Sequence, residues 1–102
     1  MRVCALVSDL MDRSRISAVI ADAVFVRDVA SCGDADVVIV DLARSGIEVG
    51  ALRAAAPSAR LVCFGPHVDE GSAATAREAG ADVVLPRSRF FHDPLAAMSA
   101  GF

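Results

Sequence analysis

The chain has 102 residues, a mass of 10.6 kDa and a formal net charge of −3. Its hydrophobic fraction of 55% is sufficient for a packed core and excludes an intrinsically disordered chain. The isoelectric point near 5.1 argues against nucleic acid as a partner, because a phosphate-binding surface needs an excess of basic residues. The length predicts a single domain over residues 1–102.

Membrane and disulfide-rich classes are also excluded by the sequence. No apolar run approaches the roughly 20 residues of a membrane span, and the N-terminal segment lacks the pattern of a signal peptide. The three cysteines, Cys4, Cys32 and Cys63, are odd in number and lack CxxC spacing, so they predict neither a disulfide framework nor a metal site. We therefore expect a cytoplasmic protein in which Cys4 and Cys63 are buried thiols.

The first half of the chain predicts three strands and one helix. The apolar run Val3–Val7 is typical of a strand buried on both faces. Four apolar residues then recur at the spacing of one helical stripe: Ile16, Val19, Ile20 and Ala23. The segments 23–26 and 37–40 predict the next two strands. Only about eight residues, 29–36, connect them, so we expect a loop or a single turn instead of the usual crossover helix.

The second half alternates helices and strands. We expect helices over 47–56 and 72–79, and strands over 60–64 and 82–85; Gly80 is a natural C-terminal cap for the second of these helices. Segment 86–92 is expected to be a loop. The pair Asp93-Pro94 predicts the start of a short last helix. Its inner face is expected to carry Leu95, Met98 and Phe102.

Buried strands that alternate with helices predict an α/β fold with a parallel sheet between two helical layers. Five strands in a chain of this length suit a flavodoxin-like, three-layer sandwich with the strand order 2-1-3-4-5 and a reduced or absent second crossover helix.

Two carboxylates follow neighbouring strands of this predicted sheet. Asp9 comes after the first strand and Asp41 ends the third, with Ser8 beside them. In open parallel sheets, ligands bind outside the carboxyl ends of the strands, so both side chains are expected in one crevice. Two carboxylates there suit a divalent cation such as Mg²⁺, and without one the pKa of either group is expected to rise.

The whole pattern resembles the CheY-like receiver domain of response regulators, the phosphoacceptor module of bacterial two-component signalling. Four segments carry the resemblance: Leu6–Leu10, Val37–Asp41, Leu61–Gly65 and Glu78–Asp82. The resemblance implies that Asp41 is the phosphorylated aspartate and Asp9 the second member of the acidic pair. It also implies that the Ala43 main-chain carbonyl is the third protein ligand of Mg²⁺.

Several family positions are altered in this chain. Ser8 replaces the first acid of the pair, Gly65 the switch Thr or Ser, Val84 the aromatic switch residue, and Arg87 the Lys. Gly65 has no hydroxyl to donate. The planar guanidinium of Arg87 has the geometry to pair with Asp41 and so to occupy the place of metal and phosphate, but the sequence does not decide whether it reaches Asp41. The leading hypothesis is a stand-alone pseudo-receiver, not an enzyme, that regulates by protein contact and requires no cofactor.

The predicted partner surface is the face that receivers build from their fourth helix, fifth strand and fifth helix. Here it covers about 71–102, and its contact residues are Arg87, Arg89, Phe90, Phe91 and Phe102. We expect a homodimer or a protein partner there, without nucleic acid or membrane.

Two alternatives stay open. One is a phosphorylatable receiver that depends on Mg²⁺ and uses Asp41. The other is a small-ligand module that uses the crevice of Asp9, Asp41, His67 and Arg87. The segment after the first strand has no GxGxxG pattern, so a dinucleotide site is not expected.

Overall fold

The five strands form one parallel sheet in the order β2-β1-β3-β4-β5, as the sequence predicts. The computed structural model describes residues 1–43, 46–66 and 69–99. The strands are β1 (Val3–Leu6), β2 (Val24–Phe25), β3 (Val37–Asp41), β4 (Arg60–Gly65) and β5 (Val83–Pro86). The inner strands β1 and β3 are buried along their whole length, as expected for a sheet covered on both faces.

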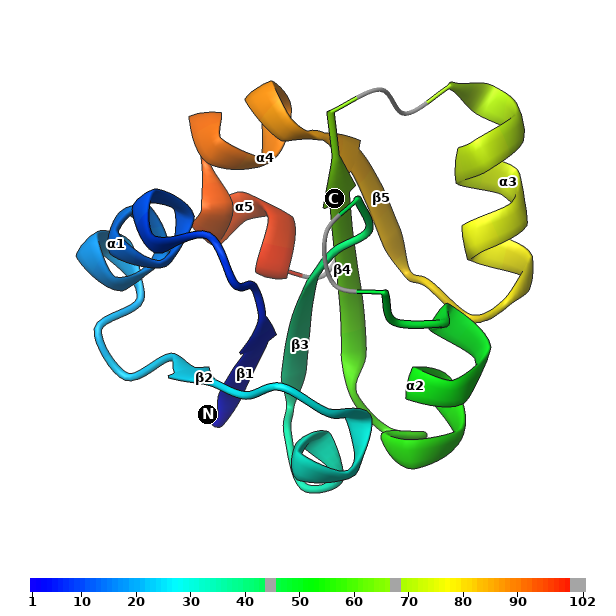
Figure 1. Ribbon diagram of the computed structural model, residues 1–102, viewed down its shortest axis with the longest axis horizontal. Coiled ribbons are helices and arrows are strands. Elements are labelled where there is room, and N and C mark those ends of the chain that lie inside the picture. Colours follow the sequence, from blue (N-terminus) through cyan, green and yellow to red (C-terminus); the bar gives the residue numbers. More distant parts are fainter. Residues whose placement is uncertain (44–45, 67–68, 100–102) are drawn as a thin grey trace.

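Helices cover the sheet on both sides (Figure 1). They are α1 (Leu10–Val19), α2 (Val49–Ala55), α3 (Glu70–Glu78), α4 (Arg87–His92) and α5 (Pro94–Met98). Alternate residues of each strand enter two separate cores. Cys4 and Leu6 pack with Leu52 of α2, whereas Ala5 packs with Ile16 of α1 and Phe90 of α4. The predicted three-layer sandwich is therefore confirmed.

The connection between β2 and β3 contains only a single 3₁₀ turn, η1 (Val29–Cys32), which confirms the expected loss of a crossover helix. The side chain of Asp28 begins this turn, because its Oδ1 accepts hydrogen bonds from the Ser31 backbone N (3.0 Å) and Oγ (2.9 Å). Cys32 anchors the turn in the core beneath α2. The turn therefore covers only part of the face on which a full helix would lie.

Three local predictions are wrong. Segment 87–92 is a helix and not a loop, because Phe90 anchors it in the core with no exposed surface. Val19 and Leu95 were expected to face inward but are 45% and 50% exposed. On α5 the inward positions are taken by Pro94 and Ala97, whose small side chains allow close packing on the sheet.

Two further observations concern the expected chemistry of the fold. Cys4, Cys32 and Cys63 are all buried free thiols, and burial raises the pKa of Cys63 to about 12 and that of Cys32 to about 11, so both stay protonated and unreactive. In the described part of the chain, no helix has the length and apolar character needed to cross a bilayer.

Candidate functional site

The carboxyl ends of β1 and β3 bring Asp9 and Asp41 to the same edge of the sheet. The two strands are paired in parallel as far as Leu6 and Val40. Asp9 is the N-cap of α1, where its Oδ1 accepts a hydrogen bond of 3.0 Å from the backbone N of Asp12. The structure therefore places both residues at this edge.

Asp41 is only 2% exposed, which is unusual for a carboxylate. Its Oδ1 accepts a hydrogen bond of 3.0 Å from the backbone N of Ala43. Its Oδ2 is buried and has no hydrogen-bond partner among the described residues. A buried carboxylate oxygen without a partner carries a desolvation cost that a bound cation or a proton would relieve. Asp41 thus has the atom that a cation at this edge would contact.

Arg87 does not pair with Asp41, a pairing that the sequence leaves undecided. Its guanidinium forms a two-point ion pair with Asp12 of α1: Nη1 donates to Oδ2 at 2.6 Å, and Nη2 donates to Oδ1. Asp12 is completely buried. The hydrogen bond to Asp12 raises the pKa of Arg87, and the charges of Asp12, Asp41 and Asp9 contribute in the same direction. Arg87 is therefore held at α1 and remains within the electrostatic field of the acidic edge.

The role of Asp12 was not predicted, although the sequence contains a signal for it. Asp12 lies four residues before Ile16, so the two residues share one face of α1, and Ile16 is fully buried. An acid on the apolar stripe of a helix requires a buried partner. Arg87, which follows β5 and begins α4, provides it.

An aromatic cluster surrounds the ion pair. The rings of Phe64 and Phe90 are stacked with centroids 4.7 Å apart, and Phe91 meets both rings edge-on. The guanidinium carbon of Arg87 lies 5.1 Å from the centre of the Phe91 ring, and that of Arg15 lies 4.2 Å from it. Phe90, expected at a partner surface, is instead a core residue, and Phe91 is half-buried.

Of the remaining predicted positions, two are buried, two are exposed and two lie outside the described residues. Gly65 is buried at the end of β4, and Val84 is buried in β5 against the α2 and α3 layer. Ser8 and Arg89 are exposed. His67 and Phe102 lie outside the described residues, so the crevice of Asp9, Asp41, His67 and Arg87 stays a prediction.

Comparison with known proteins finds neighbours by structure only. No family model matches the chain, and no curated protein matches by sequence. A response regulator from Burkholderia pseudomallei, solved with a phosphorylated aspartic acid, calcium and citrate, has a TM-score of 0.79 at 16% identity over 98% of this chain and 68% of its own.

Two further structures agree with this result. A response regulator from Thermotoga maritima has a TM-score of 0.75 at 13% identity over 97% of this chain and 98% of its own. The signal receiver domain of a DNA-binding response regulator from Colwellia psychrerythraea has a TM-score of 0.64 at 13% identity over 86% of this chain and 87% of its own. The chain has the CheY-like receiver fold.

Proposed function

We propose that the protein is a pseudo-receiver, a regulatory protein of bacterial signalling that works by protein contact and has lost efficient phosphotransfer. The observation that carries this proposal is the ion pair between Arg87 and the buried Asp12. In a receiver, the cation at this strand end must approach the phosphoryl oxygens on the acceptor aspartate. Here the corresponding cation is Arg87, and two hydrogen bonds hold it to Asp12 of α1 instead of to the acceptor aspartate.

Two other positions reduce phosphotransfer further. Gly65 ends β4 without the hydroxyl that would bind a phosphoryl oxygen. Ser8 leaves the edge with one carboxylate fewer than the acidic pair of a receiver, so the attraction for a divalent cation is weaker. These changes remove donors and charge that would stabilise the transition state.

Protein contact is proposed at the face formed by α3, β5, α4 and α5. β5 is an edge strand; α3 and α4 pack against it, and α5 packs against α4 and β4 (Figure 1). Arg89 is exposed there, and Leu95 is an exposed apolar side chain on α5. Because Phe90 is in the core, this surface depends on Arg89, Leu95 and the half-buried Phe91. A cytoplasmic, non-enzymatic protein is consistent with this mode of action.

The unpartnered Oδ2 of Asp41 favours a second candidate, a receiver that is still phosphorylated with the help of Mg²⁺. The carboxylates of Asp9 and Asp41 and the main-chain carbonyl of Ala43 would hold the ion. When bound, Mg²⁺ would supply the positive charge that stabilises phosphoryl transfer. One carboxylate oxygen of Asp41 would attack the phosphorus of a donor such as acetyl phosphate, and the bond from phosphorus to the leaving acetate would break.

Incubation with acetyl phosphate and Mg²⁺, followed by intact mass measurement, separates the two candidates. We expect no phosphorylated species in the wild type, and more phosphorylation in the double variant Gly65→Thr/Arg87→Lys, which restores the hydroxyl and the slender cation. The backbone at Gly65 does not itself require glycine, since positive backbone φ among the described residues occurs only at Gly46 and Gly80.

Asp41→Asn is the control in both backgrounds, because it removes the acceptor oxygen. A wild-type protein that gains one phosphoryl group, and loses it in Asp41→Asn, would show that the second candidate is correct.

A further inference from the structure

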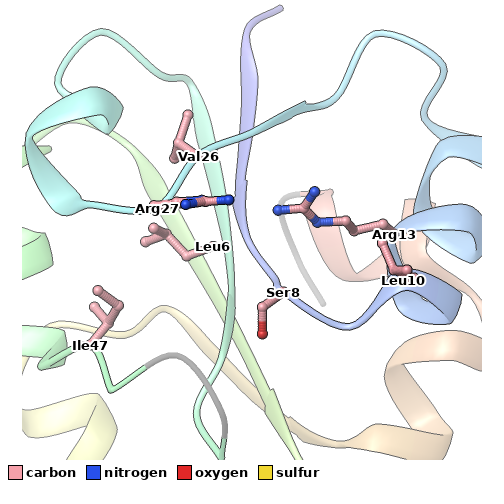
Figure 2. Close-up of a pocket in the computed structure, with 7 residues that line it drawn as sticks. All are labelled: Leu6, Ser8, Leu10, Arg13, Val26, Arg27 and Ile47. Atoms are coloured by element: carbon pink, nitrogen blue, oxygen red, sulfur yellow. The ribbon is translucent and has the colours of Figure 1, made fainter.

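A separate cavity of about 350 Å³ lies at the carboxyl ends of β1 and β2. Its lining residues come from β1, the start of α1, the end of β2 and the segment before α2: Leu6, Ser8, Leu10, Arg13, Val26, Arg27 and Ile47 (Figure 2). This volume is at the lower end of the range for small-molecule sites. The cavity does not include Asp41 or Arg87, so it is distinct from the site described above.

One side of the cavity is apolar. Leu6 belongs to the core under α2, and Val26 and Ile47 pack against the same core while remaining partly exposed. The single turn η1 stands in place of a full crossover helix, and Val26 and Ile47 remain incompletely covered. An apolar group of a few carbon atoms would bury them.

The other side carries two guanidinium groups and a hydroxyl, and no carboxylate is among the lining residues that the structure describes. Figure 2 shows the guanidinium groups of Arg13 and Arg27 pointing toward each other from opposite sides, with Ser8 nearby. Two cations that face one cavity repel each other. An anion bound between them would be attracted by both and would outweigh this repulsion.

Both arginines are available for such an anion. Arg13 is positioned by the hydrogen bond from its Nε to the Val7 carbonyl, 2.8 Å, and by the ring of Phe25, 5.2 Å from its guanidinium carbon. Within the described part of the chain, Arg27 has no hydrogen bond or ion pair. The adjacent acid, Asp28, is engaged by Ser31 at the start of η1.

We infer that this cavity binds a small organic anion, in which a carboxylate or phosphate group lies between Arg13 and Arg27 and a short apolar body contacts Leu6, Val26 and Ile47. The guanidinium forks match the geometry of such oxyanions. The inference does not depend on the proposed function. The cavity shares Ser8 with the acidic edge, but the inference uses neither the carboxylates of that edge, nor Arg87, nor the α3–β5–α4–α5 face.

An amide NMR titration with four probes tests the inference. Phenyl phosphate and benzoate carry the anion and the apolar body, inorganic phosphate carries only the anion, and benzyl alcohol only the body. We expect saturable shifts at Leu6, Ser8, Arg27 and Ile47 with phenyl phosphate or benzoate. The tighter of the two identifies the oxyanion, and either result supports the site.

Arg27→Gln removes one cation without removing any contact of the fold, and should weaken binding about tenfold or more. Arg77→Gln, an exposed arginine on α3, is the matched control and should leave binding unchanged. The inference is overturned if no probe gives saturable shifts, if inorganic phosphate or benzyl alcohol binds as tightly as the full probes, or if both variants behave alike.

Discussion

At the scale of single residues, the chemistry at the carboxyl ends of β1 and β3 is determined by which acid forms the ion pair with Arg87. Asp12 is fully buried, so its charge has no access to water and depends on the guanidinium. Asp41 is also buried, but one of its oxygens lacks a partner among the described residues. Arg87 therefore neutralises the charge of Asp12, whereas Oδ2 of Asp41 has no partner among the described residues.

Arg87→Gln should lower the free energy of unfolding by about 3–5 kcal/mol, since it leaves the Asp12 carboxylate buried without its counter-charge. Denaturant unfolding followed by circular dichroism measures this loss, and the chain has no Trp or Tyr for fluorescence. Arg89→Gln, at an exposed position on the same helix, is the control and should change stability little.

A double-mutant cycle tests whether the pair acts as a unit. The apolar double variant Asp12→Leu/Arg87→Met should lose less stability than the single variants Asp12→Leu and Arg87→Met lose together, because no charge remains buried in it. If the losses from the two positions simply add, the ion pair does not determine the stability of this edge.

At the scale of elements, the hydrophobic pattern predicted the five strands, because buried parallel strands are short continuous apolar runs. Their order was predicted from the flavodoxin-like fold that five such strands suit. The pattern failed over 87–92, where a six-residue helix is too short to show a periodic stripe and is held by one buried ring, Phe90. Gly80 was predicted as a helix end and has a positive φ of 124° there.

The candidate site was only partly predictable for a related reason. Asp9 and Asp41 follow directly from strand ends, whereas the partner of Arg87 depends on the rotation of α1 against α4. Those two helices are 75 positions apart at the contact. The sequence predicts which groups reach one edge, but not which of three neighbouring acids receives the cation.

Aspartate side chains cap the N-termini of α1, η1, α3 and α5. The cap at Asp69 allows the contribution of the aspartate charge to be tested. Its Oδ1 accepts a hydrogen bond of 2.7 Å from the backbone N of Ser72 at the start of α3. Hydrogen bonds from Ser72 lower the pKa of Asp69. The stability that the charged cap contributes is therefore complete above its unfolded pKa and disappears as the pH falls through its folded pKa.

Asp69→Asn retains the acceptor oxygen and removes the titrating charge. We expect the wild type to be more stable than this variant at neutral pH, and the difference to vanish in acid. Thermal unfolding across that range measures it. A difference that does not change with pH would show that the charge of Asp69 contributes nothing to the cap.

At the scale of the whole molecule, the two sheet edges differ. The edge at β2 is a strand of two residues, too short to pair extensively with another chain. The edge at β5 has four residues and is flanked by α3 and α4, with α5 packed against α4 and β4 (Figure 1). If the protein acts by contact, as we propose, the longer edge with its exposed Arg89 and Leu95 is where a second copy would bind.

Sedimentation velocity over a range of concentrations should then show a dimer that Arg89→Glu/Leu95→Asp converts to monomer. Both substitutions are at exposed positions, so they act on the surface and leave the core intact, unlike a change at Phe90. Met11→Asp, at an apolar position on α1 that is 75% exposed, is the matched control and should leave the dimer unchanged. A wild type that stays monomeric throughout would exclude self-association, and regulation at this face would then require a different protein as its partner.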